Sequence, residues 1–134
     1  MEENTNMKKF NYRGKTLDEL KAMSLEEFAK LCKSRPRRSL LKGYDKKFLK
    51  KVEAAKKNPK AKPVRTHRRD LVVIPAIVGA KLSIHKGNSF ENVDITEKML
   101  GHYLGEFALT RKKLVHGKAG IGATKSSTAV TARG

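Results

Sequence analysis

Arginine is the residue type in this sequence with the clearest chemical potential, because its arginines gather in two short segments. A guanidinium group forks onto phosphate oxygens and stacks on bases. Residues 30–69 contain both segments but only two acidic residues, Asp45 and Glu53, so most of the positive charge there needs an anion from outside the chain. The pattern predicts a surface that binds nucleic-acid phosphates. The arginines are Arg35, Arg37, Arg38, Arg65, Arg68 and Arg69.

Catalytic, metal and nucleotide sites have no comparable support. The four histidines lie far apart, without an HxxxH or HExxH pair, so a zinc site is not expected. The glycines of residues 117–122 have no apolar strand before them and no helix-forming segment after them, as a P-loop requires. Glu97 lies in the first turn of a predicted helix, where the helix dipole stabilises a negative charge, so its presence needs no catalytic role. Because no nucleophile, base and orienting group can be named together, we expect no enzyme and no cofactor.

The composition indicates one small domain with tails. The chain has 134 residues, of which 38% are hydrophobic and 6% aromatic, with no tryptophan, so only a small core can form. The lone cysteine, Cys32, excludes an internal disulfide, and we expect it to pack on an apolar helix face. The first ten residues lack an apolar stretch, and no run approaches the ~18 apolar residues of a membrane helix. We therefore expect a cytoplasmic protein without a membrane partner.

The net charge of +18 is concentrated in two parts of the chain. Residues 30–69 carry +15 and residues 111–134 carry +6, whereas residues 1–29 and 70–110 are close to neutral. A segment at +15 repels itself unless an anion neutralises it, and such a basic chain is typical of nucleic-acid binding. The low aromatic content argues against a surface that reads single strands by stacking. We therefore expect a structured RNA, held by its shape and its phosphates.

Helix-capping patterns predict the elements of the first half. S/T-x-x-E motifs begin at Thr16 and Ser24, and Asp45 precedes a lysine-rich amphipathic stretch. Pro36 is predicted to end the second helix, which leaves residues 37–43 as an extended basic loop. The predicted helices cover residues 17–22, 25–33 and 46–57.

The second half predicts a small antiparallel sheet of two or three strands. A basic linker over residues 56–69 leads to an apolar run. Residues 81–85 then alternate between apolar and polar, residues 86–89 suit a hairpin turn, and residues 90–95 suit a return strand. Gly79 interrupts an apolar run and is predicted to hold a backbone position that no larger residue can share. The fold class predicted is α+β.

The chain after the predicted sheet has weaker patterns. Thr96 is predicted to cap a short helix over residues 97–101, and residues 104–107 are predicted to be irregular. Gly105 is predicted to sit in a backbone position closed to larger residues. Residues 117–134 have almost nothing to bury, so we expect a flexible basic tail that orders only on binding.

Four segments resemble a family of ribosomal proteins. The specific one is residues 95–111, ITEKMLGHYLGEFALTR, which is similar to the family pattern ITENMVGHKLGEFAPTR. Weaker likenesses lie at residues 38–43, 68–79 and 83–87. The sequence is identified as a member of the universal S-nineteen family of small-subunit ribosomal proteins, called S-fifteen in eukaryotic usage. The extension before residue 37 resembles the archaeal and eukaryotic branch.

The resemblance implies a structural, non-catalytic role in the head of the small ribosomal subunit. It implies binding to the 3′ major domain of the small-subunit rRNA, a complex with the S-thirteen family protein, and a C-terminal tail that approaches the tRNA sites. It also implies a division into residues 1–36 (helical extension), 37–116 (rRNA-binding domain) and 117–134 (tail). The RNA-contact residues predicted from both lines of reasoning are Arg37, Arg38, Lys42, Arg68, Arg69, His85, Lys86, Gly87, His102, Gly105, Thr110 and Arg111.

Two other classes of protein remain as alternatives. A DNA-compacting protein would be expected to show a recognition helix or a dimer motif, and preferential binding to duplex DNA would favour it. An enzyme that acts on RNA would need a carboxylate or histidine cluster, and turnover by the purified protein would favour it.

Overall fold

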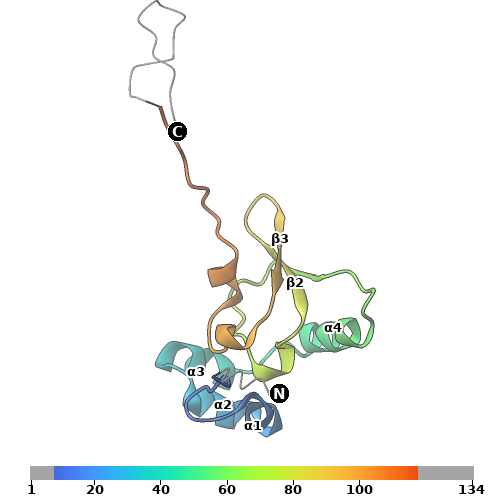
Figure 1. Ribbon diagram of the computed structural model, residues 1–134, viewed down its shortest axis with the longest axis vertical. Coiled ribbons are helices and arrows are strands. Elements are labelled where there is room, and N and C mark those ends of the chain that lie inside the picture. Colours follow the sequence, from blue (N-terminus) through green and yellow to red (C-terminus); the bar gives the residue numbers. More distant parts are fainter. Residues whose placement is uncertain (1–7, 118–134) are drawn as a thin grey trace, which may run out of the picture.

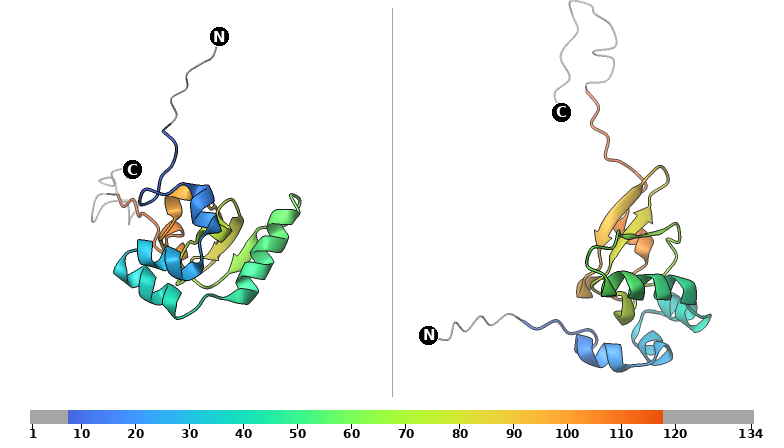
Figure 2. Two further views of the ribbon diagram at one scale, coloured as in Figure 1. Left: turned by 90° about the horizontal axis from the view of Figure 1, so that it is seen from below. Right: turned by 90° about the vertical axis from the view of Figure 1, so that its right-hand side faces the viewer.

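The computed structural model describes residues 8–117, and the tail predicted for residues 117–134 lies outside that range except for Gly117. Four α-helices precede a three-stranded sheet, which confirms the α+β class. In Figures 1 and 2, the helices gather at one end and the β2–β3 hairpin projects from the other. The elements are α1 Leu17–Ala22, α2 Leu25–Leu31, α3 Ser34–Leu41, α4 Lys46–Lys57, β1 Val64–Thr66, β2 Lys81–His85 and β3 Phe90–Asp94, with short 3-10 helices η1 Pro75–Ile77, η2 Glu97–Met99 and η3 Leu104–Phe107.

Three of the helices begin where their capping residues predicted. The Ser24 hydroxyl accepts from the Glu27 N–H at 3.3 Å, and the Glu27 carboxylate accepts from the Ser24 N–H at 3.0 Å. Asp45 Oδ1 accepts from the N–H groups of Lys47 and Phe48 at 3.0 and 3.2 Å. Each capping side chain satisfies backbone donors that the first turn leaves free. Helices α1, α2 and α4 are therefore confirmed, with α2 ending two residues before its predicted end.

The extended loop predicted for residues 37–43 is wrong, because Ser34–Leu41 forms helix α3. Pro36 lies in the first turn, where its missing N–H has no intrahelical partner to lose. The helix ends at Leu41, and Gly43 follows two residues later with a φ of 110°, which suits a glycine after a helix. The basic side chains of this segment therefore project from a rigid helix.

The sheet has the order β1-β2-β3 and is mixed. Strands β2 and β3 form the predicted antiparallel hairpin, closed by a hydrogen bond from Lys86 N–H to Ser89 C=O at 2.8 Å. Strand β1 pairs with β2 in parallel, so an all-antiparallel sheet is wrong. Strand β1 lies inside the predicted basic linker. Its three residues are too few to show the alternation of apolar and polar residues that marks a strand.

One core joins all parts of the described chain. Phe28 of α2, Val52 of α4, Val73 of the segment before η1, Leu82 of β2 and Leu104 of η3 are at most 1% exposed. The extension before residue 37 thus shares its core with the sheet. Cys32 is 2% exposed, as predicted, and its burial raises the pKa of the thiol. Within residues 8–117, no helix is long and apolar enough to cross a membrane.

The segment after the sheet packs back on residues 71–73. Val73 N–H donates to His102 C=O at 2.8 Å, and Leu104 N–H donates to Leu71 C=O at 2.9 Å. The predicted helix over 97–101 is a shorter 3-10 helix, without a hydrogen bond from the Thr96 side chain, and residues 104–107 form a second 3-10 helix instead of an irregular segment. Gly79 has a φ of 87°, which confirms its predicted conformation.

Candidate nucleic-acid interface

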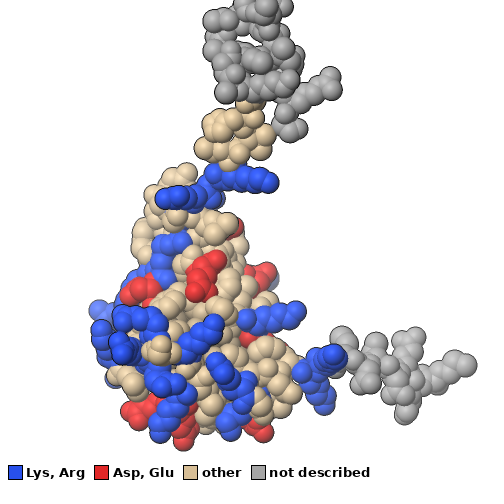
Figure 3. Space-filling view, turned by 90° about the vertical axis from the view of Figure 1, so that its left-hand side faces the viewer, with Lys and Arg blue, Asp and Glu red and all other residues tan. Residues whose placement is uncertain are grey.

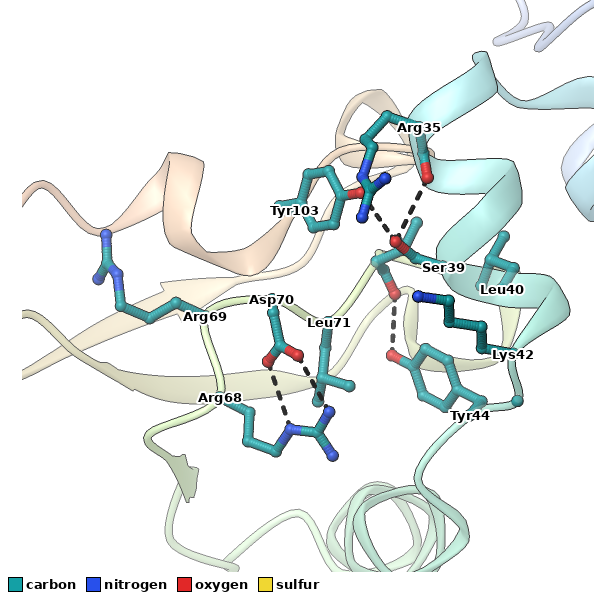
Figure 4. Close-up of a pocket in the computed structure, with 12 residues that line it drawn as sticks. Arg35, Ser39, Leu40, Lys42, Tyr44, Arg68, Arg69, Asp70, Leu71 and Tyr103 are labelled. Atoms are coloured by element: carbon teal, nitrogen blue, oxygen red, sulfur yellow. Dashed lines mark hydrogen bonds and ion pairs between the residues drawn. The ribbon is translucent and has the colours of Figure 1, made fainter.

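A groove of about 830 Å³ lies between helix α3 and the segment of residues 68–72. We call it the α3 groove; Figure 4 shows its lining side chains. Four of them are cationic and one is acidic, and the remainder are small, aromatic or aliphatic. An open groove whose charged side chains are mostly cationic suits a phosphate backbone better than a small apolar ligand. Its lining residues are Arg35, Ser39, Leu40, Lys42, Gly43, Tyr44, Arg68, Arg69, Asp70, Leu71, Val72 and Tyr103.

Two hydroxyl contacts hold α3 and the turn that follows it against the remainder of the domain. Ser39 Oγ and Tyr103 Oη lie 3.0 Å apart across one end of the groove. The Tyr44 hydroxyl donates to Val72 C=O at 2.8 Å. Burial raises the pKa of Tyr44, so this phenol remains a neutral hydrogen-bond donor over the physiological range. The two contacts fix the wall from which Arg35 and Lys42 project.

Arg68 is a cation of the groove that already has protein partners. It makes a two-pronged ion pair with Asp70, at 3.1 and 3.3 Å, and a longer one with Asp45 at 3.5 Å. The hydrogen bonds between them raise the pKa of Arg68 and lower the pKa of Asp70. The guanidinium is half exposed, so these pairs lie in water and are individually weak. A phosphate group can therefore compete for Arg68.

Arg69 is committed to the protein interior. Its guanidinium donates to the carbonyl of His85 at 2.8 Å, to that of Gly105 at 2.7 Å and to that of Ala108. These bonds join the end of β2 to both ends of η3. A Cβ on Gly105 would lie 3.0 Å from Arg69 Cβ and 3.1 Å from its carbonyl oxygen, so Gly105 gives this side chain its room.

Arg37 is exposed, but its guanidinium is also engaged by backbone carbonyls of the protein. Its guanidinium donates to the carbonyls of Ala29, Lys30 and Cys32 at 3.2 to 3.4 Å, at the C-terminal end of α2. A cation at this position donates to carbonyls that have no partner within the helix, and the negative end of the helix dipole stabilises its charge. Arg38, the next residue, is exposed and has no ion pair within residues 8–117.

A second cationic cluster lies beside the tip of the β2–β3 hairpin. A cavity of about 420 Å³ there brings Lys86 next to Thr110 and Arg111, three of the predicted contact residues. Gly87 forms the tip with a φ of 107°, and its N–H donates to His85 Nδ1 at 3.1 Å. We call this set the hairpin cluster, and it includes Asn88, Glu91, Leu109 and Lys112.

His102 lies in neither cluster. Its Nδ1 is 2.7 Å from a carboxylate oxygen of Glu106, four residues later. Figure 3 shows that lysine and arginine side chains cover much of one face of the molecule, with fewer acidic ones among them. Within residues 8–117, no group of three metal-ligating side chains is close enough to hold a metal ion.

Ten of the twelve predicted contact residues divide into three structural groups, and His85 and His102 lie outside them. Arg38, Lys42 and Arg68 lie on or beside the α3 groove, and the hairpin cluster holds three more with Gly87 at its tip. Arg37 and Arg69 hold the fold together, with Gly105 beside Arg69. Arg35 also lines the groove; it is one of the arginines expected to bind phosphate but not one of the twelve predicted contact residues. Tyr44 and Tyr103 line the groove as well, and no sequence pattern singled them out. The helical spacing from Arg35 to Ser39 and Lys42 places Arg35 on the groove side of α3.

Comparison with known proteins identifies the family. A family described as "Ribosomal protein S19" matches residues 37–116. The chain is also 48% identical over 124 residues to "Small ribosomal subunit protein uS19" of Halorubrum lacusprofundi, which covers 90% of this chain and 88% of that protein. The chain belongs to the ribosomal protein S19 family. It is therefore a ribosomal protein, and its family is not a family of enzymes. The α3 groove and the hairpin cluster both lie within the matched residues of this S19-family protein.

Proposed function

We propose that this S19-family protein is a structural component of the small ribosomal subunit that binds small-subunit rRNA through the α3 groove and the hairpin cluster. The observation that carries the proposal is the α3 groove, whose lining includes three cations that are not committed to backbone carbonyls and one carboxylate. The groove is open and rigidly walled, as binding to helical RNA by shape and phosphate requires. The uS19 relative is by its name a protein of the small subunit.

The predicted residues take different parts in this proposal. Direct contacts with RNA come from Arg38, Lys42 and Arg68 and from Lys86, Gly87, Thr110 and Arg111. Arg37, Arg69 and Gly105 act by holding the surfaces in place, since their groups are engaged within the protein. His102 contacts RNA from the exposed side of its ring.

The finer location rests on the family resemblance. We propose a place in the subunit head, on the 3′ major domain of the rRNA, with the S-thirteen family protein as a neighbour. We also propose that residues 117–134 form a basic tail near the tRNA sites, after an extension over residues 1–36 and an rRNA-binding domain over residues 37–116. The match of the family to residues 37–116 supports the middle boundary.

The salt dependence of binding to a transcript of the 3′ major domain tests the rRNA proposal. Each phosphate contact contributes about −0.7 to −0.9 to the slope of log K against log salt. We expect a steep slope for the full chain, and a slope shallower by roughly one contact for Arg38→Ala and for Lys42→Ala. Lys98→Ala removes one exposed charge outside both clusters and should leave the slope unchanged. A flat slope, or tighter binding to duplex DNA of equal length, would contradict the proposal.

A further inference from the structure

Three aromatic side chains and an arginine form one cluster at the end of the sheet. His67 follows β1, His85 ends β2 and Phe90 begins β3. His85 and Phe90 are direct partners in the antiparallel register, and the parallel pair Thr66–Ile84 places His67 next to His85. The register thus brings the three rings into one row across the sheet.

The rings pack closely without being buried. The His67 and His85 centroids lie 4.5 Å apart at an interplanar angle of 30°, and Phe90 meets both rings edge-on, at 5.2 and 5.0 Å. The guanidinium carbon of Arg65 lies 5.2 Å from the Phe90 centroid. His67 and Arg65 are exposed, and His85 and Phe90 are half-buried. The opposite face of the sheet holds the buried Thr66, Leu82 and Ile84.

The polar atoms of the cluster remain available to a ligand. His85 Nδ1 accepts from Gly87 N–H at 3.1 Å, which places the proton of the neutral ring on Nε2 as a donor. Within residues 8–117, the ring nitrogens of His67 have no hydrogen-bond partner and Arg65 has no ion pair. The cluster therefore combines an exposed aromatic face, free ring nitrogens and an unneutralised guanidinium.

We propose that this cluster binds one unpaired nucleotide of RNA, with the base stacked on His67 and the phosphate on Arg65. Aromatic side chains on the open face of a sheet stack unpaired bases. A phosphate lies within one ribose of its base, so a guanidinium beside the rings suits the same nucleotide. A site that bound only phosphate would not explain the row of three rings. Packing of the rings on one another would not explain the arginine without an ion pair beside them. The proposal rests on the proposed rRNA binding and adds a site for an unpaired base.

Matched RNA strands with and without bases test the proposal. The full chain is titrated with a short oligoadenylate and with an abasic ribose-phosphate strand of the same length and charge. Binding is measured by calorimetry, and the ring resonances of His67, His85 and Phe90 are followed by NMR. We expect oligoadenylate, but not the abasic strand, to move all three sets of resonances upfield.

Substitutions at His67 separate stacking from charge. His67→Leu removes the ring, and we expect it to weaken oligoadenylate binding by about tenfold, as loss of one stacked base implies, without affecting the abasic strand. His67→Phe keeps an aromatic face and should restore most of the affinity. His116→Leu, the same replacement at an exposed histidine outside the cluster, should behave as wild type.

Two results would overturn the inference. One is wild-type affinity of His67→Leu for oligoadenylate, and the other is an equal shift of the ring resonances with the abasic strand. In either case, continued steep salt-dependent binding to the 3′ major domain transcript would leave the proposed function intact. Failure of the wild-type chain to bind the 3′ major domain transcript would instead contradict the proposed function.

Discussion

Arginines that are neighbours in the sequence have opposite tasks in this protein. Arg37 and Arg69 donate to backbone carbonyls, whereas Arg38 is exposed and Arg68 has exchangeable ion pairs. The sequence suggested that an external anion must neutralise most of them, because so few carboxylates lie nearby. Carbonyl oxygens at helix and strand ends are a second kind of partner, and no pattern of residue types reveals them.

Replacing Arg69 and Arg38 should separate these tasks. Arg69→Ala leaves three carbonyls without their donor, so we expect a loss of about 2–3 kcal/mol in the free energy of unfolding. Arg69→Lys should recover little of it, because an ammonium cannot fork between the carbonyls. Arg38→Ala should keep wild-type stability and weaken binding to the rRNA transcript. Thermal melts and calorimetric titrations measure both, and equal stability of the Ala variants would contradict the division.

Gly105 should be less tolerant of alanine than Gly79. An added Cβ at Gly105 meets Arg69 at 3.0 Å, which we expect to cost about 1–3 kcal/mol by overpacking. At Gly79 nothing lies within 4 Å of such an atom, and only its φ of 87° opposes the change, at about 1 kcal/mol. In a double-mutant cycle, Gly105→Ala should keep most of its cost when Arg69 is already alanine, because that change removes only the Nε at 3.2 Å and leaves the Cβ and the carbonyl oxygen. Complete loss of the cost would show that the outer part of the Arg69 side chain, and not its Cβ and carbonyl oxygen, opposes the added atom.

The Cys32 thiol should react slowly with iodoacetamide in the folded protein. Burial raises its pKa, so the reactive thiolate is rarer than in the unfolded chain at every pH below the folded pKa. Because the pKa of Cys32 is higher in the folded state, its contribution to the free energy of unfolding is fully present below pH ~9. That contribution is progressively lost as the pH rises through the pKa of the folded state. Labelling rates from neutral to alkaline pH, with the urea-unfolded chain as control, measure this. Equal rates in the two states would contradict the buried position.

Whole elements were predictable where a capping residue or a strict period marked them. Helices α1, α2 and α4 follow Thr16, Ser24 and Asp45, and β2 alternates between apolar and polar residues. Helix α3 was missed because Pro36 was interpreted as a stop, although a first-turn proline is compatible with a helix. Strand β1 was missed because its three residues depend on pairing with β2, a contact far along the chain. The sequence therefore predicted the positive charge of the residues around the α3 groove, but not the helix that forms one of its walls.

Helix α4 allows a test of an element and its cap together. Asp45 caps α4 through Oδ1 and meets Arg68 through Oδ2. Asp45→Ala should cost about 1 kcal/mol through loss of the cap. Asp45→Asn keeps an acceptor for the cap while losing the charge, so it should melt near the wild type. If both variants melted alike and well below the wild type, the ion pair would matter more than the cap.

At the scale of the whole molecule, the buried core of the described residues stops well before residue 117. Within residues 8–117, the last buried hydrophobic residue is Ala108, and residues 109–117 are all exposed. We expect a chain truncated after His116 to keep its melting temperature, because the sequence of residues 117–134 has almost nothing to bury. The proposed role of the tail requires that ribosomes carrying the truncated protein bind tRNA less well. A truncated protein that fails to fold would contradict the domain boundary, and normal tRNA binding would contradict the role.

The exposed residues 109–112 lie beside the hairpin tip, and the chain then runs away from it to residue 117, as Figures 1 and 2 show. Nine extended residues reach at most about 30 Å. The segment therefore works as a tether, and docking of the body fixes the small volume that Arg111, Lys112 and Lys113 can search. Within that volume the effective concentration of phosphate is high, so even weak charge pairs there form readily. Lengthening the tether by a neutral insertion after Leu109 should dilute that advantage while leaving the α3 groove unchanged.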